Sequence, residues 1–328
     1  MKKVPISIII DDPAPVISVY HEHADSPTTK DGRPLLPTFP NSMLFEFCDI
    51  VERHGIKGKF SVVPMPGNKG DIATGIDGAD PKEVDEWLTT VKERLMPSFS
   101  ICPEMLTHHK TVDLQTGRAL DLPENEWSYT QNRSTLTPYI AHALSILAKV
   151  GIRSIGVTSP WDFGISVEDE YVAAISQAVK EVSGSDLSWY FLRGLRNVPN
   201  AKPWVALDED GRVVVAIPST TYDTCWKTID STDTSAAYVS RLADEWITLD
   251  GKDGYIIRVL QSGGYPIMVT HWQSLASNGL YTGLRVLDEV GRRVSLLLSD
   301  RVEWMSFEEI LHMVVADKES YPPRHFES

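Results

Sequence analysis

The chain has 328 residues, of which 42% are hydrophobic and 23% charged, so it can bury one large core or two small ones and is neither disordered nor fibrous. Its formal net charge of -14, from 31 basic and 45 acidic residues, argues against nucleic acid and against an anionic membrane surface as the main partner. No cluster of lysine and arginine offers a track for phosphates.

The cysteines and the first residues favour a cytoplasmic protein. Cys48, Cys102 and Cys225 are widely spaced and odd in number, which predicts neither a disulfide framework nor a metal knuckle. The start "MKKVPISIII" is apolar for only a few residues before two aspartates, too short for a secretory signal, and no window reaches membrane-spanning length. We therefore expect a reducing compartment. Nothing in the sequence determines the oligomeric state.

Short apolar runs alternate with longer amphipathic patterns along the whole chain, which predicts βα units around a parallel sheet. The expected strands are 6–10, 58–63, 154–157, 213–217, 266–270 and 301–305. The expected helices are 42–55, 137–151, which opens with a Thr-Pro start, 282–294 and 306–315, where Ser306 and Glu309 form a capping box. We predict an α/β fold of one barrel-like domain over 1–328, with the Gly-rich segment 64–81 as a functional loop or lid.

Polar residues directly follow several of these strands, and in a parallel barrel the carboxyl ends of the strands carry the active site. Two interpretations of the adjacent Asp11 and Asp12 stay open: a solvated turn, or a metal ligand beside a catalytic base. The other candidates at predicted strand ends are His108, His109, Asp113, Trp161, Asp162, Tyr222, Asp223, Trp226, His271 and Trp272.

A metal site can be assembled from three of these residues. His109 and Asp113 are four apart, so on a helical turn they share a face, and Asp12 would complete an N/O ligand set with room for water. His108 is ambiguous, since consecutive side chains point in different directions. The cluster "YHEH" at 20–23 could supply a further ligand or could be a solvated loop.

The order of these features resembles the polysaccharide deacetylase family, the NodB-like carbohydrate esterases. "IIIDD" resembles the strand that ends in the family's DD pair, "GKFSVV" resembles its next strand, and "IMVTHW" resembles its late strand ending in a histidine. "HHKTVD" is nearest to the family's pair of metal-binding histidines, with Asp113 where the second histidine should stand. "TSPWDFG" stands at the family's R-x-P-Y/W-G loop but lacks the arginine.

The resemblance implies a distorted (β/α) barrel with one divalent metal, zinc or a similar ion. Asp11 would be the general base, His271 the general acid, and Asp12, His109 and Asp113 the metal ligands. The implied reaction is hydrolysis of a C–N amide bond, removing an acetyl or similar acyl group from an N-acetylated sugar or related small substrate.

Substrate contacts and two rival functions complete the expectations. Trp161, Trp226 and Trp272 could stack on a sugar ring, although core packing is an equal alternative, and Asp223 is a further substrate-binding candidate. One rival is a metal-independent glycosidase with two carboxylates, such as Asp11 and Asp223. The other is a non-catalytic barrel that only binds carbohydrate.

Overall fold

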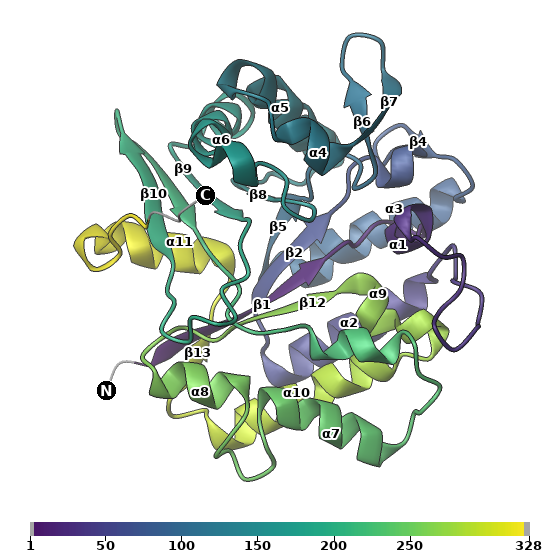
Figure 1. The fold of residues 1–328 in the computed structure, drawn as a ribbon, viewed down its shortest axis with the longest axis vertical. Helices are drawn as coiled ribbons and strands as arrows, with labels where there is room; N and C mark the ends of the chain where they lie inside the picture. The colour runs from purple at the N-terminus through teal and green to yellow at the C-terminus, as the bar shows by residue number, and fades with distance from the viewer. Residues whose placement is uncertain (1–2, 325–328) are drawn as a thin grey trace.

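The computed structural model describes residues 3–324, so residues 1–2 and 325–328 of the predicted domain lie outside the described part (Figure 1). Its centre is a set of parallel strands in two sheets. One sheet has the order β12 (Ile267–His271), β1 (Val4–Asp11), β2 (Gly58–Val62), β5 (Phe99–Pro103), and β13 (Val302–Trp304) pairs with the start of β1. The other has the order β10 (Trp204–Glu209), β11 (Arg212–Ala216), β9 (Leu187–Phe191), β8 (Gly156–Thr158), with β10 antiparallel.

The two sheets are joined at both sides, which makes them a distorted barrel. On one side a parallel bridge pairs Glu104, just after β5, with Thr158 of β8. On the other side the backbone N–H of Thr220, after β11, donates to the carbonyl of Ile267 in β12 at 2.8 Å. The predicted α/β barrel is therefore confirmed.

Strand β1 is buried along almost its whole length, as expected for an apolar run in the middle of a parallel sheet. Its one polar interior residue, Ser7, donates to the carbonyl of Met305 at 2.7 Å, which satisfies the hydroxyl. Gly58 opens β2 because a Cβ there would lie 1.9 Å from the carbonyl oxygen of Ile8. A larger residue at this position would therefore push β2 away from β1.

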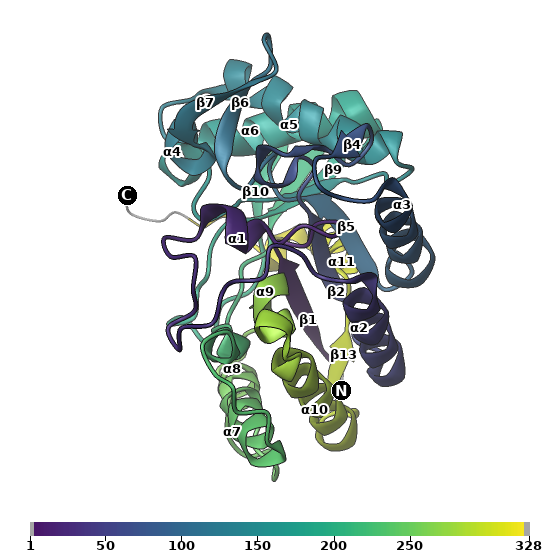
Figure 2. The ribbon, with the colours of Figure 1, turned by 90° about the vertical axis from the view of Figure 1, so that its right-hand side faces the viewer.

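Helices cover the outside of the barrel, with α5 and α6 side by side above the strands and α2 and α10 below them in Figure 1 and, turned by 90°, in Figure 2. The α-helices are α1 (Val19–His23), α2 (Asn41–His54), α3 (Pro81–Thr90), α4 (Glu124–Ser128), α5 (Arg133–Lys149), α6 (Glu168–Ser183), α7 (Ala236–Trp246), α8 (Tyr255–Gln261), α9 (Trp272–Ala276), α10 (Thr282–Leu297) and α11 (Phe307–Ala316). Within the described residues, no helix is both long and apolar enough to cross a bilayer.

Two local predictions are corrected by the structure. Helix α5 starts at Arg133 because Asn132 caps it through a capping box, so Pro138 lies inside the helix and not at its start. The segment expected to be a helical turn at 109–113 is instead strand β6 (Lys110–Asp113), which forms a hairpin with β7 (Arg118–Pro123). The capping box of Ser306 and Glu309 at α11 is confirmed.

Candidate active site

A cavity of about 460 Å³ is lined by residues at or just after the carboxyl ends of β1, β5, β8, β9, β11 and β12. The side chains that line it are mainly polar and belong to segments far apart in the sequence. They include Asp11, Asp12, Glu104, His108, Arg196, Asp223, His271 and Gln273, with Trp161 and Trp226 as aromatic neighbours. Several candidates taken from the sequence therefore meet here.

Asp11, the last residue of β1, forms a buried ion pair with Lys59 of β2. Lys59 has no solvent exposure, and Asp11 is nearly as buried. Burial alone would lower the pKa of Lys59, but the negative charge of Asp11 outweighs it and raises that pKa. Lys59 thus remains a cation inside the barrel and provides the counter-charge for Asp11.

Asp12 points in a different direction because its backbone is left-handed, with φ of 69°. Its N–H donates to Glu104 Oε2 at 2.6 Å, and its Oδ2 accepts a hydrogen bond from the side-chain amide of Gln273. Its Oδ1 lies 3.0 Å from His108 Nε2. The change of backbone conformation therefore separates two adjacent carboxylates and gives each its own cationic partner.

Asp12, Glu104 and His108 form a compact group, with one ligand atom from each within 4.8 Å of the others. All three side chains are buried. His108 Nε2 is 3.6 Å from Glu104 Oε1, and Glu104 also accepts a hydrogen bond from the hydroxyl of Ser61 on β2. Asp12 follows β1, and Glu104 and His108 follow β5, with β2 between these two strands, so the sheet itself brings the ligand atoms together.

In the metal-free protein, Glu104 and His108 hold protons at neutral pH, because the pKa of each is raised. Burial raises the pKa of Glu104 to about 8, assisted by the negative charges of Asp11 and Asp12. Burial would lower the pKa of His108, but the charge of Asp12 outweighs it and raises that pKa to about 9. Burial would likewise raise the pKa of Asp12, yet the charge of His108 holds it well below its usual range.

The donor set suits a divalent metal. Two carboxylates and an imidazole are ligands that zinc and similar ions accept. Among the described residues, the buried Oδ1 of Asp12 accepts no well-aligned hydrogen bond, so a lone pair is free at the centre of the group. The three residues therefore fit a divalent metal ion.

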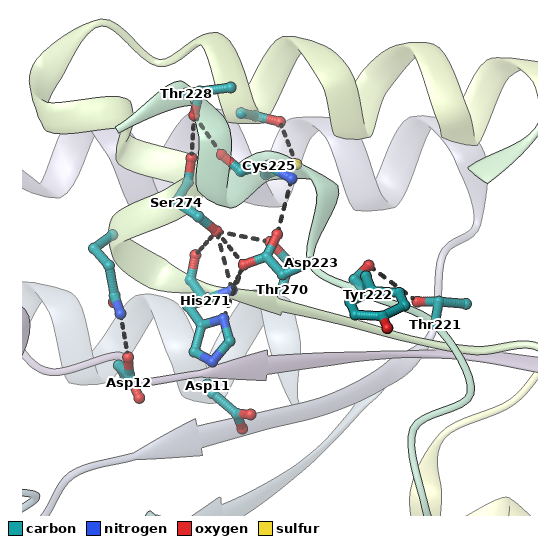
Figure 3. A network of polar contacts seen from close by, with 12 residues as sticks. Asp11, Asp12, Thr221, Tyr222, Asp223, Cys225, Thr228, Thr270, His271 and Ser274 are labelled. Atoms are coloured by element: carbon teal, nitrogen blue, oxygen red, sulfur yellow. Dashed lines mark hydrogen bonds and ion pairs between the residues drawn. The ribbon is translucent and has the colours of Figure 1, made fainter. Parts of the chain in front are cut away.

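His271 ends β12 and is held by Asp223, which follows β11 (Figure 3). Its Nδ1 lies 2.8 Å from Asp223 Oδ2, and Asp223 also accepts the hydroxyl hydrogen of Ser274 and the N–H of Cys225. Burial would lower the pKa of His271, but the hydrogen bond to Asp223 and the charges of Asp12 and Asp223 raise it to about 10. Since Asp11 and His271 are register partners in β1 and β12, the imidazole lies beside the aspartate pair.

Aromatic side chains form the wall between this cavity and a larger one. Trp161, 45% exposed, packs edge-on against His108 with 4.3 Å between ring centroids, and Trp226 packs against His271 at 5.0 Å. His23 of the "YHEH" cluster stacks on His108 at 4.8 Å, and its burial lowers its pKa to about 3, so it is neutral. His23, Trp161 and Trp226 also line the neighbouring cavity of about 1170 Å³.

The predicted ligands His109 and Asp113 are not brought to Asp12, which corrects the predicted ligand set. His109 lines the larger cavity, with its Nδ1 3.1 Å from the Oδ1 of Asn68. Asp113 is the last residue of β6, and its Oδ1 accepts the backbone N–H of Gln115 in the turn of the β6–β7 hairpin. The helical turn on which this pairing rested is a strand, so the two side chains do not share a face toward the cavity.

Two of the predicted substrate contacts have other places in the structure. Trp272 is 2% exposed and packs against Phe47 and Phe60, with 5.6 Å between ring centroids in each pair, so it belongs to the core. Asp223 lines the cavity, but its carboxylate is occupied by His271 and Ser274. Trp161 and Trp226 remain as aromatic residues that face the cavity.

Glu104 and Lys59 were missed from the sequence although each leaves a signal there. Glu104 and His108 are four residues apart directly after β5, the same spacing as in the family's pair of metal-binding histidines. Lys59 is a charged residue inside the otherwise apolar run "GKFSVV". A buried lysine in such a strand requires an acidic partner, and the adjacent strand ends in one.

Comparison with known proteins gives a likeness of fold. No family model matches the chain, and no curated protein sequence matches it. Among solved structures, a presumed polysaccharide deacetylase of Mycobacterium smegmatis superimposes with a TM-score of 0.52 at 13% identity, covering 87% of this chain and 80% of that one.

Two further solved structures are similar at a lower level. A presumed glycoside hydrolase/deacetylase of Parabacteroides distasonis has a TM-score of 0.48 at 8% identity, covering 95% of this chain and 71% of that one. A GH57-type branching enzyme of Pyrococcus horikoshii has a TM-score of 0.49 at 10% identity, covering 100% and 73%. The protein from Mycobacterium smegmatis shows that this chain has the fold of a presumed polysaccharide deacetylase.

Proposed function

We propose that the protein is a metal-dependent hydrolase that cleaves a C–N amide bond, removing an acetyl or similar acyl group from an N-acetylated sugar or a related amide. One observation carries the proposal. A buried group of Asp12, Glu104 and His108, able to hold a metal, lies beside a carboxylate paired with a cation and an imidazole paired with a carboxylate. The resemblance of the sequence motifs and the likeness of fold support the same function.

Asp12, Glu104 and His108 are the residues that would hold a divalent ion, zinc or one of similar preference. When bound, such an ion polarises the amide carbonyl and lowers the pKa of a coordinated water toward neutrality. Their burial excludes bulk water from the group, which strengthens its electrostatic interactions.

Asp11 is the general base in this proposal. It lines the cavity beside Asp12, and its contact with Lys59 holds the carboxylate where it can accept a proton from the attacking water. Lys59 takes the place of the arginine that is missing from the "TSPWDFG" segment, from a different strand. Its burial and its contact with Asp11 fix the direction in which the carboxylate points.

His271 is the general acid. With its pKa raised to about 10, the imidazolium is present at neutral pH and can donate a proton to the leaving amine. Asp223 holds the ring through Nδ1, which leaves Nε2 as the atom that can donate. Base and acid thus come from neighbouring strands, β1 and β12, on one side of the metal-binding group.

The substrate would be held by the aromatic wall. Trp161 and Trp226 line both cavities, so a sugar ring in the inner cavity can stack on either indole while the rest of the molecule extends into the outer one. The glycosidase alternative loses support because the carboxylate of Asp223 is engaged by His271. A barrel that only binds carbohydrate is an outcome of the test below.

The test is a substrate panel of N-acetylated sugars, acetyl esters and aryl glycosides, assayed with added metal and with chelator. We expect acyl release from the amides and esters that disappears with chelator and returns with metal. Glycosidic cleavage that survives chelation would favour the two-carboxylate mechanism. Binding without turnover of any substrate would favour a non-catalytic barrel.

A further inference from the structure

Two of the proposed metal ligands, Glu104 and His108, lie at the two ends of one tight loop. The loop contains two residues with left-handed backbones, Met105 with φ of 26° and His108 with φ of 51°. Residues other than glycine rarely adopt this backbone conformation, and it persists only where the surroundings impose it. Something outside the loop must therefore hold His108 in place.

That restraint is the carboxylate of Glu124, the first residue of α4. Its Oε1 accepts the backbone N–H of Leu106 at 2.9 Å and of Thr107 at 3.1 Å, and its Oε2 accepts the N–H of His108 at 3.0 Å. The hydroxyl of Tyr139 also donates to Oε1, at 2.7 Å. Three consecutive N–H groups that converge on one carboxylate form a nest, a geometry suited to an anion.

We propose that Glu124 is the positioning residue of the metal site: it fixes the loop that places His108 Nε2 beside Asp12 and Glu104. This inference rests on the metal-binding part of the proposed function. Glu124 itself is fully buried beneath the loop and does not line the cavity, so it acts through His108 alone.

The other side of the loop is held by the Gly-rich segment. The carbonyl of Leu106 accepts the N–H of Met65 at 2.8 Å, and that of Thr107 accepts the N–H of Gly67 at 3.0 Å. These hydrogen bonds engage the carbonyl groups of the loop, whereas Glu124 accepts hydrogen bonds from its backbone N–H groups. The N–H of Glu124 in turn donates to the carbonyl of His109 at 2.9 Å, which fastens the return of the β6–β7 hairpin to the loop. Because Glu124 directly follows β7, the β6–β7 hairpin brings the chain back so that Glu124 lies beside the loop.

Replacing the carboxylate by an amide isolates this role. Glu124→Gln keeps the size of the side chain but replaces one acceptor oxygen by an NH₂ group, which cannot accept any of the converging N–H groups. The loop then has a donor facing a donor at a buried position, and His108 loses its fixed place. We expect metal affinity to fall by about 10- to 100-fold, the usual effect of removing a residue that orients a metal ligand.

Two measurements on folded protein test this proposal. The first is the dissociation constant for zinc, from competition with a chromophoric chelator. The second is amide hydrogen exchange at 106–108 in metal-free protein, where we expect faster exchange in Glu124→Gln. Tyr139→Phe removes a single donor to the same carboxylate, so a smaller change of the same sign is expected, and it decides the question if Glu124→Gln does not fold.

The matched control is Glu168→Gln. Glu168 is a partly buried carboxylate that likewise accepts a tyrosine hydroxyl, from Tyr190 at 2.7 Å; it also pairs with Arg193 and does not line the cavity. The Glu168→Gln variant should have a lower melting temperature, with zinc affinity and hydrogen exchange at 106–108 unchanged.

The inference would be overturned if Glu124→Gln had the same zinc affinity and the same exchange at 106–108 as the wild type. It would also be overturned if Glu124→Gln and the control Glu168→Gln lost the same amount of zinc affinity. A wild-type protein that takes up no metal would instead overturn the proposed function and the metal part of this inference. The exchange data would then decide separately whether Glu124 fixes the loop.

Discussion

The imidazole of His271 lies against the carboxylate of Asp223, with 2.8 Å between Nδ1 and Oδ2. The pair joins the end of β12 to the segment after β11, so it forms where the barrel closes. Because Asp223 raises the pKa of His271, the acid of the proposed reaction depends on a residue that does not itself contact the reacting amide. The first prediction follows from this relationship.

Asp223→Asn should lower the pKa of His271 from about 10 toward its ordinary value of 6.5. A general acid must be protonated, so the rate of amide hydrolysis falls as pH rises through that pKa, and the falling limb of the pH–rate profile should move to lower pH in the variant. Profiles of kcat for an N-acetylated sugar in both proteins measure this shift. An acetyl ester of an acidic phenol is the control, since its leaving group needs no proton. An unmoved alkaline limb would contradict the role of His271 as acid.

The same pair makes a prediction for stability. The folded-state pKa of His271 lies above its unfolded value, so the interaction stabilises the fold fully below about pH 6.5 and this contribution is lost as pH rises to about 10. Metal-free wild type should therefore lose more stability than Asp223→Asn between these two values. Urea unfolding at intervals across that range measures the difference. Parallel curves for the two proteins would be the contrary result.

The neighbouring histidines 108 and 109 provide a matched pair of variants for the metal site. His108→Ala should abolish the binding of one equivalent of divalent metal, because His108 contributes the only nitrogen in the group of possible ligands found among the described residues. His109→Ala should keep it, since that ring contacts Asn68. Elemental analysis of protein prepared without chelator distinguishes the two. The reverse result would restore the ligand set expected from the sequence motifs.

Metal binding should release protons. At neutral pH the metal-free protein holds a proton on Glu104, with a pKa of about 8, and one on His108, with a pKa of about 9. Both ligands must lose these protons to bind a metal, so affinity should rise about 100-fold per pH unit up to about pH 8, tenfold for each proton. Calorimetric titration in buffers of different ionisation enthalpy counts the protons. Glu104→Gln should release about one fewer, and a pH-independent affinity would contradict the assignment.

The ion pair between Lys59 and Asp11 is predicted to matter most when it is broken from one side. Lys59→Met leaves a buried carboxylate without its cation and should cost about 3–5 kcal/mol of unfolding free energy. In the double variant Lys59→Met, Asp11→Asn the charge is removed from both sides, so most of this loss should be recovered. Urea denaturation of the two proteins gives the comparison. A double variant as unstable as Lys59→Met would show that packing, not charge, is responsible.

Two tryptophans predicted for the same role should behave differently. Trp161 is exposed beside the cavity, so Trp161→Ala should leave the fold intact and raise KM for a sugar substrate roughly 2- to 10-fold with little change in kcat. Trp272 is packed in the core, so Trp272→Ala should cost about 3–5 kcal/mol of unfolding free energy. Steady-state kinetics and thermal unfolding of both variants separate the roles. Equal destabilisation by the two would place Trp161 in the core as well.

The barrel could be predicted because its strands leave a strong pattern. A parallel strand buried on both faces is a continuous apolar run, and such runs marked β1, β2, β11 and β12 within a few residues. The pattern does not predict several other strands, among them β5 and β9, whose sequences "FSICP" and "LSWYF" contain small polar residues that interrupt the run. Their burial comes from the neighbouring strands, which a local pattern does not report.

The site could be predicted only in part for a similar reason. Asp11, Asp12 and His271 directly end or follow apolar strands, and the structure places all three on one cavity. The choice between His108 and His109 depends instead on a left-handed backbone at His108, which is imposed by Glu124 from beyond a hairpin. Contacts between residues 16 positions apart across an irregular loop follow no period, so spacing alone pointed to the wrong histidine.

Every carboxylate described at the strand ends of β1 and β11 has a cationic neighbour supplied by the protein. Lys59 faces Asp11, His108 faces Asp12, and His271 faces Asp223. In many metal sites the acidic ligands repel one another when the ion is absent, and such proteins fold only with the metal bound. Here the positive charges of Lys59, His108 and His271 neutralise the carboxylates without a metal ion. In the hydrolase proposed above, the chain could therefore fold before it takes up a metal, and a shortage of metal would suspend activity without unfolding the protein.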